Sequence, residues 1–287
     1  INYTTLYHLI FVVKIKNNMR VCILGSGLSS LALAKSLVNQ KIYVDVLFSK
    51  KFYSANKTRT IGISKSNLKF FNDKIINIEK IVHKLNQIEI YSDNLKKEKL
   101  INFGNNHDHL FSIVKNYKLQ EIIEKNLFSN KYFKKINHKK KINYLSDYDL
   151  IFNSDYNHPI TKKYFSKKIE KKYNSIAYTT ILKHKKISNN VAVQIFTQNG
   201  PLAFLPISDF ETSIVYSINN HLKDKNVIHG LIKNHNFRYN LKKINKIESF
   251  DLKGLSLRSY FHKNILAFGD LIHRIHPLAG QGFNMTI

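Results

Sequence analysis

The chain has 287 residues, 43% of them hydrophobic, and 46 basic against 19 acidic side chains give a net charge of +27. This length allows one large or two compact cores, whereas no stretch reaches the ~18–20 consecutive apolar residues of a membrane-spanning helix. The single cysteine, Cys22, excludes an internal disulfide and a cysteine-built metal cluster. We interpret Cys22 as a core residue because it lies in an apolar run.

The positive charge does not specify a partner. The lysines are scattered, and no recognition motif accompanies them, so we predict no nucleic-acid partner. Lys, Asn, Ile, Tyr and Phe are the residues that an AT-rich coding sequence favours, which explains the charge without a ligand. The densest basic run, residues 134–141, is interpreted as a solvated hairpin, with attraction to anionic lipid headgroups as the alternative.

The first elements predict one β-α-β unit. Residues 20–24 form an apolar run that ends at a glycine turn, residues 28–37 have helical spacing of apolar positions, and residues 41–48 form a second apolar run. This order is typical of half a Rossmann-like fold with a right-handed crossover. Residues 1–18 precede Met19 and are interpreted as a non-native extension.

The later elements indicate a second kind of structure. Residues 88–103 contain short strand-like runs, and residues 116–127 read as an amphipathic helix. Residues 175–216 alternate β-branched and aromatic side chains between turn signals, which predicts a largely antiparallel sheet in a second domain. Residues 241–247 are predicted to be helical, and residues 264–268 to return to a buried strand.

A glycine motif follows the first strand. Residues 25–30 read Gly-Ser-Gly-Leu-Ser-Ser, a G-x-G-x-x-G pattern with serine in the third glycine position. Gly25 permits the tight turn, Gly27 lets the backbone approach a pyrophosphate at the helix N-terminus, and Ser30 mainly serves helix-strand packing. The pattern favours dinucleotide binding over the alternative of an ordinary strand-to-helix turn.

The acidic residue that usually holds the adenosine ribose at the end of the second strand is absent. Phe48 occupies its position. Asp45 cannot easily replace it, because a three-residue offset in a strand points the side chain to the opposite face. We therefore expect weaker or rearranged binding of the adenosine.

A longer motif follows the strand predicted at residues 264–268. It consists of Gly269-Asp270, then His273, and then His276-Pro277-Leu278-Ala279-Gly280-Gln281-Gly282-Phe283-Asn284. It resembles the G-D-x-x-H-x-x-x-P-x-x-G-Q-G-x-N signature of class A flavin monooxygenases. The chain from Met19 resembles the ubiquinone-biosynthesis hydroxylases within that group, also at residues 59–64, 200–206 and 250–252.

This resemblance implies an α/β fold. In it, a Rossmann-like FAD-binding domain of the glutathione-reductase type is interleaved with a mostly antiparallel β-sheet substrate domain. We assign residues 19–80, 104–168 and 259–287 to the FAD-binding domain, and residues 81–103 and 169–258 to the substrate domain. The helix that begins near Gly280 is interpreted as cut short at Ile287.

The resemblance also assigns residues to the cofactor. Gly25, Gly27, Ser30, Arg59, Asp155, Gly269, Asp270, Pro277, Gly280, Gly282 and Asn284 are expected to bind FAD, and Pro277, Gly280, Gln281 and Gly282 to position the flavin. Asp270 can accept hydrogen bonds from ribityl hydroxyls, and the helix after the loop directs its positive end at the flavin. No catalytic acid or base is assigned. His273 and His276 lack a third ligand, so we predict no metal site.

Four positions depart from the family pattern around the cofactor. Lys57 replaces an acidic residue, Tyr156 a glycine, Pro159 a serine and Lys162 an arginine. Arg59 resembles the family arginine near the flavin and the nicotinamide route, with a surface salt bridge as the alternative. Handling of NAD(P)H is therefore the function that these departures affect most.

The resemblance implies an NAD(P)H- and O2-dependent enzyme that hydroxylates a polyprenylated phenol in ubiquinone biosynthesis. We expect it in the cytoplasm, with peripheral association with the inner membrane face or with a quinone-biosynthesis complex. The alternative is a catalytically degenerate flavin-fold protein that serves as a binding or scaffold component of such an assembly. The replacements Phe48, Lys57, Tyr156 and Pro159 favour this alternative.

Overall fold

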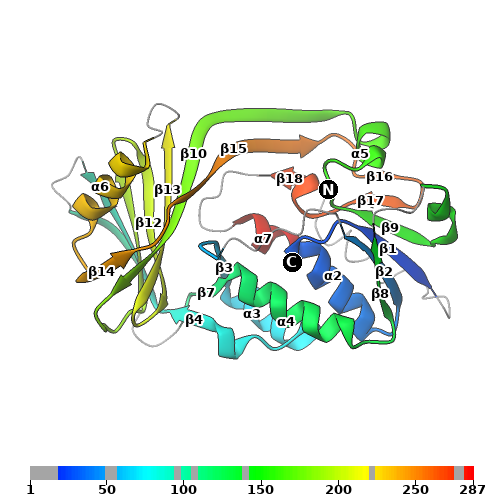
Figure 1. Cartoon of the computed structure of the whole chain (residues 1–287), viewed down its shortest axis with the longest axis horizontal. Helices are drawn as coiled ribbons and strands as arrows, with labels where there is room; N and C mark the ends of the chain where they lie inside the picture. The colour runs from blue at the N-terminus through cyan, green and yellow to red at the C-terminus, as the bar shows by residue number, and fades with distance from the viewer. Residues whose placement is uncertain are drawn as a thin grey trace.

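The computed structural model describes residues 19–48, 57–93, 98–104, 109–137, 142–219, 224–274 and 281–287. The predicted extension at residues 1–18 lies outside them. Figure 1 shows two parts joined by two long paired strands, β10 (Lys168–His184) and β15 (Glu248–Leu257). Their ladder is broken between Lys172 and Ile176, where Asn174 has a positive φ of 49°.

The first part contains a doubly wound sheet. Its strands are β1 (Arg20–Leu24), β2 (Tyr43–Phe48), β8 (Phe133–Asn137), β9 (Leu150–Asn153), β16 (Phe261–His262) and β17 (Ile265–Ala267). Their order in the described sheet is β16-β17-β9-β1-β2-β8. Strand β1 pairs in parallel with β2 on one side and with β9 on the other, so the winding reverses at β1. In such sheets, ligands bind outside the carboxyl ends of the strands at this reversal.

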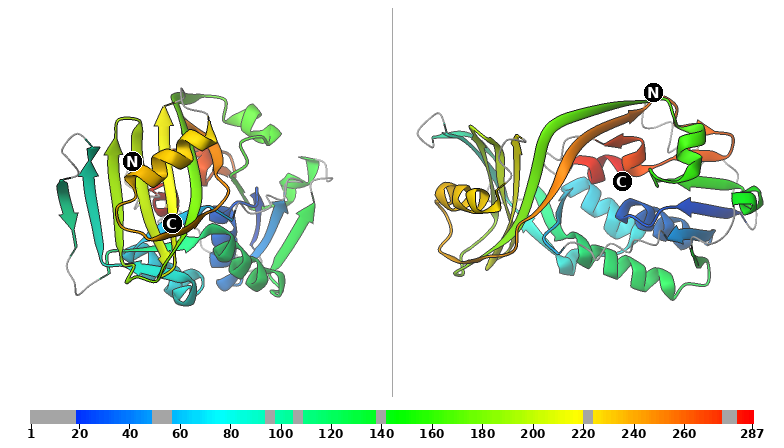
Figure 2. Two further views of the ribbon diagram at one scale, coloured as in Figure 1. Left: turned by 60° about the vertical axis from the view of Figure 1, so that its left-hand side comes forward. Right: turned by 45° about the horizontal axis from the view of Figure 1, so that its top comes forward.

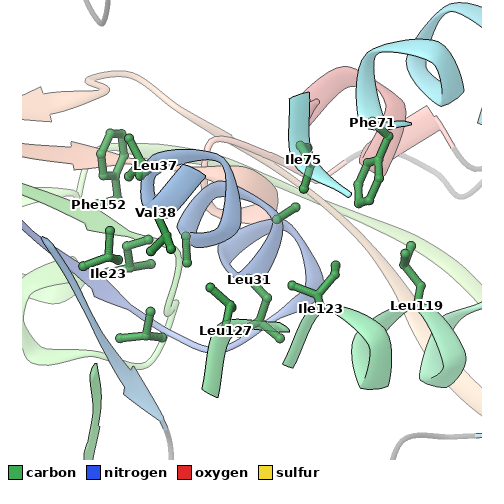
Figure 3. Close-up of a cluster of buried hydrophobic side chains, with 14 of the residues drawn as sticks. Ile23, Leu31, Leu37, Val38, Phe71, Ile75, Leu119, Ile123, Leu127 and Phe152 are labelled. Carbon is green, nitrogen blue, oxygen red and sulfur yellow. The ribbon is translucent and has the colours of Figure 1, made fainter. Parts of the chain in front are cut away.

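Helices α2 (Leu28–Asn39) and α4 (Asn116–Phe128) pack together against this sheet (Figure 3). The apolar residues Leu119, Ile123 and Leu127 are four positions apart on α4 and fully buried. Each such burial contributes about 1.5–3 kcal/mol. The Rossmann-like fold predicted for this part is confirmed.

Cys22 and Asp45 are both buried in this sheet. Burial raises the pKa of the Cys22 thiol to about 12, so the thiol stays protonated. The Asp45 carboxylate accepts hydrogen bonds from the Tyr148 hydroxyl at 2.5 Å and from the Arg20 guanidinium at 3.2 Å. Asp45 thus ties β1 and β2 to the turn before β9. Its side chain lies on the face of β2 opposite to that of Phe48, as the alternation of side chains along a strand requires.

The second part is a larger, mostly antiparallel sheet, as predicted. Its further strands are β5 (Gln87–Ser92), β6 (Lys99–Phe103), β11 (Val191–Thr197), β12 (Gly200–Ser208), β13 (Glu211–Asn219), β14 (Leu241–Ile244) and β18 (His273–Arg274). The order within the described chain is β18-β15-β10-β13-β12-β11-β5-β6, with β14 beside β10. Helix α6 (Lys225–His235) covers the face turned away from the first part (Figure 2).

A small sheet and several short helices complete the described chain. Strands β3 (Thr60–Ser64), β4 (Val82–Leu85) and β7 (Phe111–Lys115) form a small sheet in the order β3-β7-β4. The remaining helices are α3 (Lys65–Phe70), α5 (Pro159–Tyr164) and α7 (Gln281–Thr286), with a π-helical turn at Phe71–Ile75 and 3-10 turns at Glu79–Ile81, Ile142–Asp147 and Gly269–Leu271. None of the described helices has the length and apolar character needed to cross a bilayer.

The helix predicted at residues 241–247 is wrong. Residues 241–244 form β14, which pairs antiparallel with β10. Leu241 and Ile244 pack against the core under α6, whereas Lys242 and Lys243 are exposed. Apolar residues three apart suit one turn of helix, but the free edge of β10 supplies backbone partners that a short helix lacks.

The described part of residues 134–141, which were predicted to form a hairpin, belongs to an edge strand instead. Residues 133–137 form β8, which pairs in parallel with β2 at the edge of the first sheet, and residues 138–141 lie outside the described residues. The side chains of Lys134 and Lys135 are exposed on this edge strand. Lysines are common on edge strands because their charge discourages pairing with another chain.

Candidate functional site

The structure brings three predicted segments to one edge of the first sheet. Strands β1, β9 and β17 are neighbours, and their carboxyl ends lead into residues 25–30, into the turn that begins at Asp155, and into Gly269. The two glycine motifs approach each other there, because a Cβ placed on Gly269 would lie 3.5 Å from the Ser29 Cβ. This edge is the point of strand reversal and the candidate site.

The N-terminus of α2 opens onto this edge. Gly27 is its N-cap, no side chain caps the helix, and its first turn has no acidic residue. A Cβ built on Gly27 would meet no atom of the described residues within 4 Å. Uncapped N–H groups at a helix N-terminus bind anions. The open space over Gly27 therefore fits a pyrophosphate that approaches the backbone closely.

Gly25 lies against a residue that sequence reasoning missed, Ser154. Gly25 has a φ of +108°, which favours glycine, and a Cβ on it would overlap the Ser154 hydroxyl oxygen. That hydroxyl donates to the Leu24 carbonyl at 3.0 Å and lies 2.7 Å from the Ser30 hydroxyl. In the sequence, the position of Ser154 directly before Asp155 at a strand end was the available signal.

Asp155 begins a tightly bonded turn. Its carboxylate Oδ1 accepts from the Asn157 N–H at 2.9 Å, and its carbonyl accepts from the Thr161 hydroxyl at 2.7 Å. The side chain of Asn153, which is fully buried, accepts from the Asp155 N–H at 3.1 Å and donates to Thr161. These bonds within residues 153–161 fix the internal shape of the Asp155 turn.

The replacement of glycine by Tyr156 joins this turn to β10. The Tyr156 hydroxyl donates to the Glu170 carboxylate at 2.7 Å, and the Lys168 ammonium donates to the same hydroxyl. Lys168 also lies 4.5 Å from the centre of the Tyr156 ring, a cation–π contact. Pro159, the second replacement, is the first residue of α5, where proline is favoured. Both replacements thus have a structural role.

The second motif continues from Gly269 to α7. Gly269 has a φ of +62°, and Asp270 is exposed beside α7, where a Cβ on Gly282 would lie 3.9 Å from its carboxylate. Pro277 and Gly280 lie outside the described residues, and Gln281 is the first residue of α7. Gly269, Asp270 and Gly282 are therefore the residues of this motif that the structure places at the edge.

Asn284 attaches α7 to the small sheet. Its side-chain oxygen accepts from the Ser64 N–H at 3.0 Å and from the Asn67 amide at 3.1 Å, and its amide donates to the Gly62 carbonyl at 2.7 Å. The Asn67 amide also donates to the Asn284 carbonyl at 2.8 Å. Asn284 thus holds the C-terminal end of the second motif in place.

Arg59 lies at the junction of the two parts. Its guanidinium carbon is 4.3 Å from the centre of the Phe250 ring on β15. The neighbouring Thr60 hydroxyl is 2.9 Å from the Ser213 hydroxyl on β13. Arg59 thus makes a cation–π contact across the junction between the two parts.

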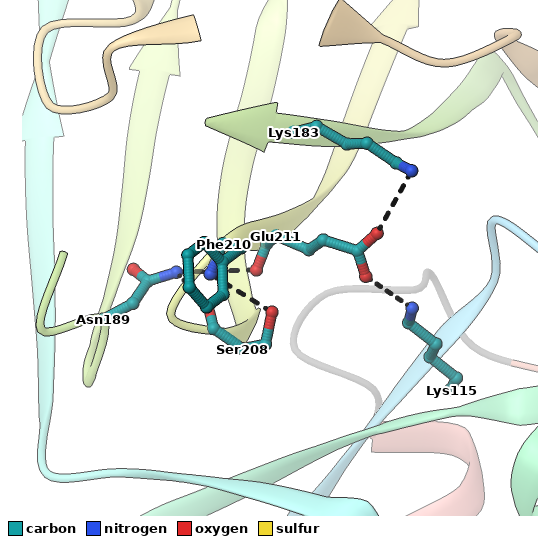
Figure 4. A network of polar contacts seen from close by, with 6 residues as sticks. All are labelled: Lys115, Lys183, Asn189, Ser208, Phe210 and Glu211. Atoms are coloured by element: carbon teal, nitrogen blue, oxygen red, sulfur yellow. Dashed lines mark hydrogen bonds and ion pairs between the residues drawn. The ribbon is translucent and has the colours of Figure 1, made fainter. Parts of the chain in front are cut away.

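An ion-pair network adds to this junction. The Lys115 ammonium at the end of β7 is 2.6 Å from the Glu211 carboxylate at the start of β13, and Lys183 of β10 is 3.9 Å from the other oxygen (Figure 4).

Among the described residues, no group of three or more His, Cys, Asp or Glu side chains could hold a metal ion. The described site is therefore built from glycines, hydroxyls, amides and the carboxylates of Asp155 and Asp270.

Comparisons with solved structures define the class of this fold. PqsL of Pseudomonas aeruginosa in complex with 2-aminobenzoylacetate is 15% identical, with a TM-score of 0.73 over 94% of this chain and 83% of that chain. HpxO of Klebsiella pneumoniae complexed with FAD and uric acid is 12% identical, with a TM-score of 0.70 over 93% of this chain and 76% of that chain. The p-nitrophenol 4-monooxygenase PnpA of Pseudomonas putida is 10% identical, with a TM-score of 0.71 over 94% and 76%.

The chain therefore has the fold of the FAD-dependent aromatic-ring monooxygenases, and the predicted resemblance to this class is confirmed. In sequence, the chain is similar to the mitochondrial ubiquinone biosynthesis monooxygenase COQ6 of Drosophila melanogaster, at 29% identity. That match covers 34% of this chain and spans 28% of the length of the relative. No protein-family model matches the chain.

Proposed function

We propose that this chain is an FAD-dependent monooxygenase that hydroxylates the aromatic ring of a phenol with NAD(P)H and O2 as co-substrates. The observation that carries the proposal is the convergence of the two glycine motifs and the Asp155 turn at the strand reversal, beside an uncapped helix with open space over Gly27. The monooxygenase fold and the sequence similarity to COQ6 support the same activity.

The residues present fit FAD. The N–H groups at the start of α2 would bind its pyrophosphate, with Gly25 shaping the turn before them. Asp270 would accept hydrogen bonds from the ribityl hydroxyls, and Pro277, Gly280, Gln281 and Gly282 would position the flavin. When bound, FAD supplies the redox chemistry that links NAD(P)H oxidation to the transfer of one oxygen atom from O2. Arg59 and Asp155 would assist in placing FAD and NAD(P)H.

The substrate that we propose is a polyprenylated phenol in ubiquinone biosynthesis. Alternation places Ile101, Phe103 and Phe196 on the face of the large sheet opposite α6, because Val193 and Ile195 of β11 pack under α6. These three residues, here called the apolar strip, are 46%, 50% and 46% exposed. Exposed apolar residues that share a face mark a binding surface. A long hydrocarbon chain would cover the apolar strip.

We propose a cytoplasmic location, with peripheral association at the inner membrane face or with a quinone-biosynthesis complex. A prenylated substrate resides in the lipid phase because each buried CH2 group contributes about 0.8 kcal/mol to its retention there. An enzyme that takes such a substrate must therefore approach the lipid surface. The net charge of +27 favours approach to anionic headgroups.

A second candidate is a flavin-fold protein without catalytic activity that acts as a binding or scaffold component of a quinone-biosynthesis assembly. Phe48 favours it, because the ring is buried, with its centre 6.2 Å from that of Phe128 of α4, instead of offering a carboxylate to a ribose. Lys135 lies 4.4 Å from the centre of the Phe48 ring and adds a positive charge at this position. FAD binding and NAD(P)H oxidation separate this candidate from the enzyme.

The first test is the visible spectrum of the purified full-length protein with added FAD. We expect an oxidised-flavin spectrum that bleaches on anaerobic addition of NADPH or NADH and returns in air. Bound flavin that never bleaches with either nucleotide would favour the scaffold. A folded protein that takes up no FAD would contradict the monooxygenase, with circular dichroism as the control for folding.

The second test concerns the apolar strip. Phe103→Ser and Phe196→Ser should each raise KM for a long-chain prenylphenol about tenfold, because they remove apolar area that the chain would cover. KM for an unprenylated phenol should not change. Phe210→Ser is the matched control, since Phe210 is 51% exposed in the turn before β13. Equal effects on both substrates would exclude a role of the apolar strip in chain binding.

A further inference from the structure

The geometry points to Ser154 as a positioning residue that locks the Asp155 turn to the first glycine motif through Ser30. This inference rests on the proposed FAD site and adds to it a residue outside both glycine motifs. The Ser30 and Ser154 hydroxyl oxygens are 2.7 Å apart although 124 positions separate them in the chain. We call this contact the serine bridge.

The direction of the serine bridge follows from its surroundings. The Ser154 hydroxyl donates its one proton to the Leu24 carbonyl at 3.0 Å. A hydroxyl has a single proton and two acceptor sites, so the Ser30 hydroxyl must be the donor to Ser154. Ser30 is buried within α2. The chain of bonds from Ser30 through Ser154 to Leu24 therefore ties helix α2, strand β9 and strand β1 together.

The neighbouring glycine makes room for the serine bridge. A Cβ on Gly25 would overlap the Ser154 hydroxyl oxygen, and the next nearest atom would be the Asp155 nitrogen at 3.4 Å. Gly25 thus admits Ser154, while a glycine at position 30 could offer it no hydroxyl. Serine in the third glycine position is therefore not a weakened motif here, because it supplies a bond that a glycine cannot make.

This lock has a consequence for binding. The α2 N-terminus and the Asp155 turn follow two adjacent strands, and a dinucleotide at the strand reversal needs both at a fixed separation. Ser154 touches Gly25 on one side and is bonded through the backbone to Asp155 on the other. Loss of the serine bridge should free the turn at residues 155–161, and in Ser154→Ala it does so without changing a residue assigned to FAD.

The test compares Ser30→Ala, Ser154→Ala and the double variant in the full chain. We expect each single variant to weaken FAD binding about fivefold, the equivalent of one buried hydrogen bond, and the double variant to be no weaker than the singles. Amide hydrogen exchange at residues 155–161 should also become faster in Ser30→Ala, although the substitution lies in α2. Ser175→Ala is the control, since its hydroxyl bonds to the Tyr173 carbonyl on β10.

Two outcomes would overturn the lock. Additive effects of the two substitutions would show that the hydroxyls act independently, and unchanged exchange at residues 155–161 in Ser30→Ala would show that α2 does not hold the turn. The exchange measurement needs no FAD. If the unsubstituted protein binds no flavin, the proposed function fails, and the exchange rates still decide for or against the serine bridge.

Discussion

Gly27→Ala should weaken FAD binding about tenfold or more, a loss of at least about 1.4 kcal/mol, while the unfolding midpoint of the FAD-free protein stays unchanged. The backbone of Gly27 has φ −69° and ψ 166°, which alanine adopts without strain. Its Cβ would meet no atom within 4 Å in the part of the chain that the structure describes. The added methyl group therefore harms the protein only where a ligand approaches the backbone.

Gly25→Ala is the matched variant and should lower both the affinity for FAD and the unfolding midpoint of the FAD-free protein. A φ of +108° is unfavourable for alanine by about 1–2 kcal/mol, and its Cβ would also displace the Ser154 hydroxyl. Urea unfolding and FAD titration of the two variants make the measurement. FAD binding by Gly27→Ala that equals that of the unsubstituted protein would contradict a pyrophosphate at the start of α2.

Asn284→Ala should destabilise the protein by about 2–3 kcal/mol, because it leaves the Ser64 N–H and the Gly62 carbonyl without their partner. Helix α7 has only six residues and cannot persist without such attachment. We therefore also expect α7 to exchange its amide hydrogens rapidly in this variant. The free energy of unfolding in urea and hydrogen exchange at residues 281–287 are the measurements.

Two further variants sharpen this result. Asn284→Asp keeps the shape and the acceptor but replaces the donor to Gly62 with a carboxylate oxygen, so it should be at least as destabilising as alanine. Met285→Ala is the control, because Met285 is the adjacent residue of α7 and is 49% exposed. If Asn284→Ala is as stable as Met285→Ala, then the bonds to β3 do not anchor α7.

The elements that sequence reasoning predicted correctly carry their signal locally. The run at residues 20–24 and the helical spacing at residues 28–37 and 116–127 correspond to β1, α2 and α4, because each buries one face or one run of apolar side chains. Strands β8 and β14 were missed, since a strand of four or five residues at a sheet edge depends on its neighbour's free backbone groups.

The residues of the candidate site also fall into those that could be predicted from the local sequence and those that could not. The glycines could be predicted from their spacing, because the requirements of a tight turn and a close backbone approach belong to single positions. Ser154 could not, since its importance depends on a contact with Ser30 across 124 positions of the chain. Likewise, the bonds from Asn284 to β3 cross more than 200 positions. The cofactor contacts and the domain boundaries stay predictions.

The two long strands also set the mechanics of the molecule. β10 has 17 residues, so it extends over about 55 Å, and its pairing with β15 makes a stiff ribbon that runs through both parts. Backbone hydrogen bonds resist shear along such a ribbon. We expect the ribbon to bend most easily at the break in its ladder between Lys172 and Ile176, where Asn174 has a left-handed conformation. Closure of the two parts over a bound molecule would therefore take place by bending at Asn174 rather than by sliding.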